Sequence, residues 1–321
     1  MAPRITAHRR PCKWVSTPVI RQRAASCRRV WVWDPTATHP NVAVGLGVPN
    51  AIQTHAPPTA MESLVAILGI PFHSISLGGA VDRVEAMIAD GGAHYVVTPN
   101  VDFLVKAQRD DELRRILVHA DLVLCDGKPI VWASRLLGGV LPARVAGSDL
   151  IPRLLKRAEE KGWRVFLLGG SPEVGSDAAR LVAAAYPALG ELAHYSPPFR
   201  PLDEMDDADI IARVHAAKPD LMLVCFGCPK QEKWIARHRL ALAVPVMIGA
   251  GATIDFLAGR MARAPVWMRR SGMEWLFRLL QEPTRLAKRY ADDFLHFFPA
   301  ILLQRWRQRP AGTRQKRKGD R

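Results

Sequence analysis

The sequence has 321 residues, of which 49% are hydrophobic, so it can form one large α/β domain or two modest ones. The formal net charge of +15 lies at the two ends of the chain, because residues 1–60 sum to +7, residues 260–321 sum to +11 and the middle sums to −3. A slightly acidic middle without a recognisable motif argues against a nucleic-acid-binding domain, whereas basic ends suit a membrane surface or a phosphate-rich ligand.

Residues 1–60 differ from the rest of the chain, since they are rich in Arg, Pro, Thr and Ala and almost without periodicity. Such composition is typical of a basic leader or a disordered extension, and we expect Met61 to be the functional start. We expect residues 61–260 to form a Rossmann-like domain and residues 261–321 to form a basic amphipathic appendage. No apolar stretch reaches the length of a membrane-spanning helix.

From Met61 onward, strand patterns alternate with helix patterns. The predicted strands lie in 94–100, 122–125, 163–170 and the first parts of 220–239 and 244–259, and each is followed by a predicted helix, the first over 101–120. Repeated strand–turn–helix units predict an α/β fold with a mainly parallel sheet and helices on both faces.

Ligands of such sheets bind in the crevice beyond the carboxyl ends of the strands. Small and polar residues gather at the predicted strand ends: Thr98, Asn100, Asp126, Gly169, Gly170, Lys230, Gln231, Gly249 and Gly251. Asp126 follows the buried run 122–125 and precedes a helix with Pro129 in its first turn. A helix N-cap is one interpretation of this aspartate, and its place in the group favours a functional one.

Three further motifs have structural as well as functional interpretations. The stretch LLGGSPEVG (167–175) suits an anion at a helix N-terminus, but it is not G-x-G-x-x-G, so a dinucleotide cofactor is disfavoured. Cys225 and Cys228 form a C-x-x-C that indicates either a redox pair or packing at a strand end. The D-x-D within 206–209 indicates either a metal site or the acidic first turn of a helix, and we favour the helix.

The motifs TPNVDF, ADLVLCDGKPIVWASRLLG, RVAGSDL, VFLLGG, FGCPKQEKW and GAGATIDFLAG follow one another in this order. Their succession, over roughly residues 64–282, resembles the TagA/WecG/CpsF family of bacterial glycosyltransferases. The resemblance implies an inverting transfer of a sugar from a UDP-sugar to a polyprenyl-diphosphate-linked saccharide, in the synthesis of teichoic acid linkage units, common antigen, capsule or exopolysaccharide.

The resemblance also implies roles for matching residues. Asp126 matches the proposed catalytic base, and Thr98 and Asn100 match residues that line the sugar pocket. Arg144 matches an arginine near the phosphates, and Gln231 matches a glutamine thought to contact the sugar. The other expected substrate-binding residues are Gly169, Gly170, Lys230 and Gly249, with Arg263 and Arg278 as candidates for the arginines that the family's C-terminal appendage supplies.

A positioned carboxylate can remove the proton from an attacking sugar hydroxyl, and arginines aimed at the departing diphosphate can stabilise its growing charge. The sequence has no convincing metal site, so we expect no metal or other cofactor and assign this charge to guanidinium groups.

The tail combines an apolar stripe, Trp275, Leu276, Leu279 and Leu280, with a basic face of Arg278, Arg285 and Arg289. The stretch 294–309 is apolar, is too short to span a bilayer and ends in arginines. We interpret the tail as an anchor on the anionic inner surface of the plasma membrane, which makes the enzyme cytoplasmic and peripheral. A helix packed on the main sheet is the alternative for its first half.

Two other functions stay open, namely a C-x-x-C thiol oxidoreductase and a non-catalytic basic protein that binds membrane or nucleic acid. The sequence leaves the transferred sugar undetermined among N-acetylmannosamine, glucose and uronic acids, and it leaves the oligomeric state undetermined as well.

Overall fold

A computed structural model of the protein describes residues 63–308. The predicted extension over 1–60, its boundary at Met61 and the tail beyond residue 308 lie outside the described residues. Within the described part, no helix is both long enough and apolar enough to cross a lipid bilayer.

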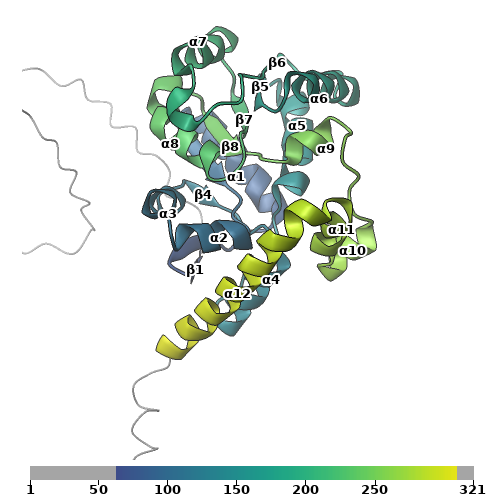
Figure 1. The fold of residues 1–321 in the computed structure, drawn as a ribbon. Helices are drawn as coiled ribbons and strands as arrows, with labels where there is room; N and C mark the ends of the chain where they lie inside the picture. Colours follow the sequence, from purple (N-terminus) through teal and green to yellow (C-terminus); the bar gives the residue numbers. More distant parts are fainter. Residues whose placement is uncertain (1–62, 309–321) are drawn as a thin grey trace, which may run out of the picture. The chain divides into compact units, whose positions relative to one another are not determined.

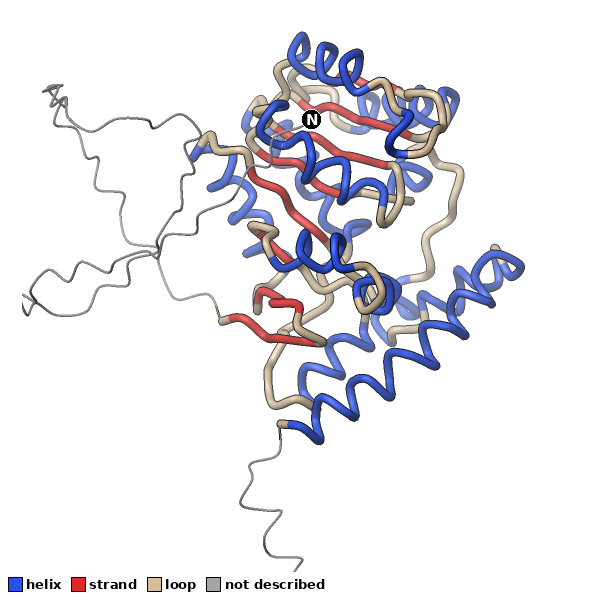
Figure 2. Tube along the Cα trace, turned by 60° about the vertical axis from the view of Figure 1, so that its left-hand side comes forward, coloured by secondary structure: helices blue, strands red, loops and turns tan. Residues whose placement is uncertain are grey.

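Six parallel strands form the central sheet in the order β4-β3-β8-β7-β5-β6 (Figure 2). Their bounds are β3 His94–Val97, β4 Leu122–Val123, β5 Val165–Gly169, β6 Leu192–Tyr195, β7 Leu221–Cys225 and β8 Val246–Gly249. The predicted mainly parallel α/β sheet is therefore confirmed. Strand β6 was not predicted, because its four residues are half-buried or exposed and give no apolar run.

Side chains alternate along each strand and build one hydrophobic core on each face of the sheet. Tyr95 and Val97 point into one core, and Val96 between them points into the other. The first core is covered by α2 Val101–Ala107, α3 Asp111–Val118, α4 Lys128–Leu136, α7 Asp207–Ala217 and α8 Lys230–Leu242. The second core is covered by α1 Leu77–Asp90, α5 Gly147–Lys161, α6 Pro172–Ala185 and α9 Thr253–Leu257 (Figure 1). A short 3-10 helix, η1 Leu202–Glu204, precedes α7.

The single helix predicted over 101–120 is wrong, because the chain forms α2 and α3 there. Asp110 explains the break: its backbone is extended and its side chain accepts a hydrogen bond from the N–H of Leu113. It therefore acts as the N-cap of α3, and the acids Asp111 and Glu112 in the first turn favour a new helix start.

A small hairpin, β1 Leu64–Ile67 and β2 Ile70–His73, precedes the sheet and was not predicted. Its turn places both Leu68 and Gly69 at positive φ, 49° and 82°. Only glycine adopts that region freely, and the usual Asn-Gly signal of such turns is absent from the sequence.

The C-terminal region forms α10 Val266–Ser271, α11 Glu274–Gln281 and α12 Pro283–Arg307. Helix α12 packs on α2, and Leu286, Phe297 and Ile301 on its inner face are at most 3% exposed. Gln304 near its end binds the hairpin, since its Oε1 accepts from the N–H of Leu68 at 2.8 Å and its Nε2 donates to the carbonyl of Ala66 at 3.0 Å. Residues 283–307 are therefore packed on the fold along one face.

Candidate active site

A cavity of about 340 Å³ opens at the carboxyl ends of β3 and β4. One wall consists of Asn100 after β3, Asp126 after β4 and the start of α4. The opposite wall consists of side chains from α11 and α12, among them Trp275, Arg278 and Phe294. The strand-end crevice predicted from the sequence is thus closed over by the C-terminal helices.

Asp126 lies at the base of this cavity on a well-fixed backbone. Its N–H donates to the carbonyl of Pro99 at 3.1 Å, and the carbonyl of Cys125 accepts from the N–H of Val145 at 2.7 Å. Helix α4 starts at Lys128, and its N-cap residue is Gly127, at φ 144° and without a side-chain capping bond. The helix-cap interpretation of Asp126 is therefore wrong, and its carboxyl group lines the cavity instead.

The surroundings of Asp126 shift its proton affinity. Burial raises the pKa of Asp126 to about 6, against the opposing effect of the positive charges on Arg144 and Arg278, and the charges on Glu274 and Asp149 raise it further. At pH 7 to 8 the carboxyl group is mostly ionised, yet it holds a proton more tightly than an ordinary aspartate. Both properties are required of a general base that works near neutral pH.

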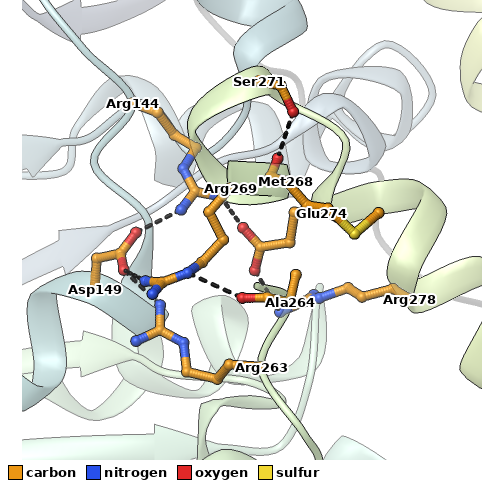
Figure 3. Close-up of polar contacts among 9 residues, drawn as sticks. All are labelled: Arg144, Asp149, Arg263, Ala264, Met268, Arg269, Ser271, Glu274 and Arg278. Atoms are coloured by element: carbon orange, nitrogen blue, oxygen red, sulfur yellow. Dashed lines mark hydrogen bonds and ion pairs between the residues drawn. The ribbon is translucent and has the colours of Figure 1, made fainter. Parts of the chain in front are cut away.

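Two carboxylates, Asp149 and Glu274, lie among four arginines (Figure 3), and two of these arginines, Arg144 and Arg278, act on the charge of Asp126. Arg144 bridges them, because it forms ion pairs with Asp149 at 2.5 Å and with Glu274. Arg263 and Arg269 also pair with Asp149, Arg269 at 3.4 Å. The side chains of Arg144 and Glu274 are only 13% and 10% exposed, so this network is largely shielded from water. The predicted residues Arg144 and Arg263 thus share one carboxylate partner.

Arg278 completes the cluster from α11. Its Nη2 lies 4.0 Å from Glu274 Oε1, its guanidinium carbon lies 5.1 Å from the ring centroid of Phe256, and its Nε is buried without a hydrogen-bond partner. Four guanidinium groups around two carboxylates leave two positive charges in excess before Asp126 ionises. Such a cluster can bind a phosphate or diphosphate group with charge-assisted hydrogen bonds.

Thr98 and Asn100 follow β3, and Asp126 follows the neighbouring strand β4. Asn100 lines the cavity, and its side chain also caps α2 by accepting from the N–H of Phe103 at 3.2 Å. Thr98 is 8% exposed and lies behind the cavity, close to Gly147 at the start of α5. The structure therefore brings Asp126, Asn100, Arg144 and Arg278 together around one cavity, with Thr98 beside them.

Gln231 and Gly249 lie farther along the sheet edge, after β7 and at the end of β8. Gln231 is 2% exposed, and its Oε1 accepts from the N–H groups of Gly227 and Gly251 at 3.0 and 3.1 Å. Its Nε2 donates to Glu232 at 2.7 Å. A Cβ atom at Gly249 would lie 2.6 Å from Gln231 Nε2, so a larger residue there would displace the Gln231 side chain from these hydrogen bonds. Gln231 thus holds two strand-end loops together.

Gly169 ends β5, Gly170 follows it, and Lys230 is the first residue of α8 after β7; all three lie outside the cavity that holds Asp126. Gly169 and Gly170 have φ of 110° and 77°, which permits the tight turn into α6. Lys230 Nζ donates to the carbonyl of Arg200 at 2.5 Å and lies 5.2 Å from the ring centroid of Phe199. The predicted site residues therefore form two groups along one edge of the sheet.

The C-x-x-C and D-x-D motifs make structural contacts. Burial raises the pKa of the Cys225 thiol to about 12 and also raises that of Cys228, and a thiol redox pair requires the opposite shift. Asp207 accepts from the indole N–H of Trp234 at 2.7 Å, and Asp209 accepts from the hydroxyl of Tyr195 at 2.6 Å. Among residues 63–308, no group of three or more His, Cys, Asp and Glu side chains is arranged to hold a metal ion.

Several residues of the site were not identified from the sequence. Asp149 belongs to the quoted motif RVAGSDL, but its role as the partner of three arginines emerges only in three dimensions. Glu274 lies 130 residues from Arg144 in the chain, and nothing in its sequence surroundings marks that pairing. Trp132 and Asp293 line the cavity and looked like ordinary helix residues.

The model of the Glycosyl transferase WecG/TagA/CpsF family matches residues 65–311. A protein of Bacillus spizizenii named N-acetylglucosaminyldiphosphoundecaprenol N-acetyl-beta-D-mannosaminyltransferase is 32% identical over 217 residues, which cover 67% of this chain and 82% of that protein. The Bacillus subtilis protein of the same name is 32% identical over 68% of this chain and 84% of its own length. A Staphylococcus aureus protein of that name is 29% identical over 70% of this chain and 87% of its own length.

The match to the family model covers most of the chain, including the strand ends, Asp126 and the C-terminal helices that close the cavity. On this evidence the chain is a glycosyltransferase and belongs to the WecG/TagA/CpsF family.

Proposed function

We propose that this chain transfers a hexose or N-acetylhexosamine from a UDP-sugar to a polyprenyl-diphosphate-linked saccharide, with inversion at the anomeric carbon. The observation that carries this proposal is a carboxyl group with a pKa of about 6, Asp126, in one cavity with Arg144 and Arg278. The names of the relatives supply the acceptor class, because each names an N-acetylglucosaminyl-diphospho-undecaprenol. The product would enter the synthesis of a cell-surface polysaccharide.

Asp126 accepts the proton of the acceptor hydroxyl while that oxygen forms a bond to the anomeric carbon of the donor. The bond between this carbon and the diphosphate oxygen breaks on the opposite face, and UDP leaves with the electron pair. Positioned general bases accelerate such steps by about 10²–10⁴-fold. Arg144 and Arg278 stabilise the charge that grows on the leaving diphosphate, with Glu274 holding both guanidinium groups in place.

The donor is proposed to lie along the strand ends, with its sugar near Thr98 and Asn100. The turn at Gly169 and Gly170 supports a place for the nucleotide part, because it leads into the N-terminus of α6, where N–H groups favour anions. A contact of Gln231 with the sugar stays a prediction, and its bonds to Gly227 and Gly251 favour a supporting role.

Transfer assays with a panel of UDP-sugars, including UDP-N-acetylmannosamine and UDP-glucose, and a short-chain polyprenyl-diphosphate N-acetylglucosamine acceptor test this proposal. Asp126→Asn should reduce turnover by at least about 10²-fold while leaving binding of the donor within a few-fold. Asp82→Asn, on a side chain that is 70% exposed, is the matched control and should retain full activity. Activity of Asp126→Asn within a few-fold of the parent would refute the base role.

We propose that the protein acts at an anionic membrane surface, where such an acceptor resides. Support comes from the outer face of α12, where Leu295, Leu302 and Trp306 are 67%, 60% and 52% exposed. This exposed apolar face of α12 also includes Phe294, which lines the cavity, so a lipid held at this face lies close to the site.

Co-sedimentation of the full chain with phosphatidylglycerol vesicles, at low and high salt, measures this attachment. Replacing Leu295 and Leu302 by Ser should release the protein, whereas the buried inner face of α12 stays intact. Salt should weaken binding only in part, because apolar contacts are not screened. Equal sedimentation of both proteins would contradict the membrane role and leave self-association as the use of this face.

A further inference from the structure

A second pair of carboxyl groups lies in the cavity, and the mechanism above does not use it. Asp102 stands in the first turn of α2 and Asp293 in α12, and both line the cavity that holds Asp126. They are 9% and 7% exposed, and their helices pack against each other (Figure 1). This side of the cavity therefore carries two acids together with two cations, because Lys106 is paired with Asp102 and Arg289 lies near Asp293.

The two carboxyl groups differ in their partners. Asp102 Oδ2 accepts a hydrogen bond from Lys106 Nζ at 2.8 Å, and Lys106 also donates to the carbonyl of Cys228 at 3.3 Å. Within residues 63–308, Asp293 receives no hydrogen bond and forms no ion pair, although it is more than nine-tenths buried. Its oxygens are not among the buried side-chain atoms that lack a partner, and the residue lines the cavity, so a ligand held there can form hydrogen bonds with this carboxyl group.

Charged groups face Asp293 from both helices. Arg289 and Asp292 belong to its own helix, and Asp102 and Lys106 belong to α2. Burial and the charge of Asp102 raise the pKa of Asp293 to about 7. Near neutral pH its carboxyl group is therefore present in both forms and can either donate or accept a hydrogen bond.

The chemistry of this wall selects the kind of ligand group. A phosphate only accepts hydrogen bonds at its charged oxygens, and an ionised Asp293 has no proton to donate to it. Sugar hydroxyls and acetamido groups are neutral and both donate and accept, so they match Asp293 in either form. The flanking rings of Tyr290 and Phe294 add apolar surface of the kind that sites for small polar molecules combine with a few polar groups.

We infer that Asp102 and Asp293 form the subsite for the acceptor's sugar ring, with Asp293 bonding directly to a hydroxyl or acetamido group of that ring. The inference rests on the proposed function and gives its acceptor an orientation. The sugar lies between the pair Asp102 and Asp293 and the base Asp126, and the acceptor's own diphosphate makes no contact with the carboxyl group of Asp293. The subsite selects a neutral sugar and disfavours one that carries a carboxylate.

Steady-state kinetics of the full chain, with a soluble farnesyl-diphosphate N-acetylglucosamine as acceptor, tests the subsite. Asp293→Leu should raise the KM for this acceptor at least about tenfold, the cost of losing one hydrogen bond to a group of this kind, without changing the donor KM. Asp293→Asn can still donate and accept and should stay within about threefold of the parent. Asp292→Leu, on the neighbouring side chain that is 45% exposed and outside the cavity, is the matched control.

Asp293 makes no hydrogen bond or ion pair within residues 63–308, and burial raises its pKa, so the melting temperature of Asp293→Leu should equal or exceed that of the parent. A second acceptor with glucuronic acid as its sugar should have a higher KM than the N-acetylglucosamine acceptor with the parent protein. The ratio of these two KM values should be smaller for Asp293→Leu. An acceptor KM within twofold of the parent, or a joint loss of stability and donor binding, overturns the subsite.

Calorimetric titration with the same farnesyl acceptor separates this inference from the proposed function. If the parent binds the acceptor but transfers no sugar from any donor, the proposed function fails. In that case a tenfold weaker Kd for Asp293→Leu still supports the subsite, and an equal Kd overturns it.

Discussion

Replacing Asp126 by Asn should make the protein more stable while it destroys activity. The fold raises the pKa of Asp126 from its usual 3.8 to about 6, because burial disfavours the charged form. Each unit of difference corresponds to about 1.36 kcal/mol, which sets an upper limit of about 3 kcal/mol on the cost of ionising this group at neutral pH. Partial exposure to water lowers the expected gain to about 1–2 kcal/mol, or roughly 2–8 °C in Tm for a domain of this size.

The dependence on pH has a definite sign. The fold favours protonated Asp126, so the parent loses stability as the pH rises from about 4 to about 6 and has lost all of this contribution above that range. The Asn variant has no such loss. Thermal melts of both proteins should therefore nearly coincide at pH 4 and separate fully above pH 7. Asp82→Asn, on an exposed side chain, should stay within about 0.5 kcal/mol of the parent at both pH values. A lower Tm for Asp126→Asn at pH 7.5, or a difference independent of pH, would refute the reasoning.

The value of kcat/KM should decrease on the acidic side of its pH profile with an apparent pKa near 6. Arg144→Gln should shift this decrease toward about pH 7, because a positive charge near Asp126 is lost. An unchanged apparent pKa in the variant would show that Arg144 does not act on Asp126. Phe297→Ala should lower the free energy of unfolding, measured by urea denaturation, by about 3–5 kcal/mol, since the ring is 1% exposed. Phe298→Ala, at a site that is 39% exposed, should lower it by about 1 kcal/mol or less. Equal losses for the two variants would contradict the packing of α12. Cys228→Ser should retain transferase activity, and treatment with iodoacetamide at neutral pH should not inactivate the parent; rapid inactivation would revive the thiol interpretation.

Local patterns identified the features that one segment determines by itself. The apolar runs at 122–125 and 244–249 predicted strands, and the rule that ligands meet strand ends then placed Asn100 and Asp126 at one edge. Pairing between distant segments has no such signature, so the bonds of Glu274 to Arg144 could not be predicted.

Helix faces were predicted less well in the C-terminal region. The amphipathic pattern identified an apolar surface on the tail, but it could not say which part packs on the protein. Phe297, within the stretch 294–309 that was interpreted as part of the anchor, lies instead in the core beside α2, while Phe298 and Trp306 stay exposed. One side of α12 is therefore integral to the fold, and the anchor interpretation applies only to its other side.

The hydrogen bonds between Gln304 and the β1–β2 hairpin join segments 236 residues apart. During synthesis, the ribosome makes Asp126 long before it makes Arg278, Asp293 and Gln304. Helices α11 and α12, which supply Arg278 and Asp293 to the cavity, are thus made after the sheet and the carboxylate that they cover. The enzyme acquires its reactive site only when nearly the whole chain has emerged, so unfinished copies should neither consume donor nor compete for acceptor.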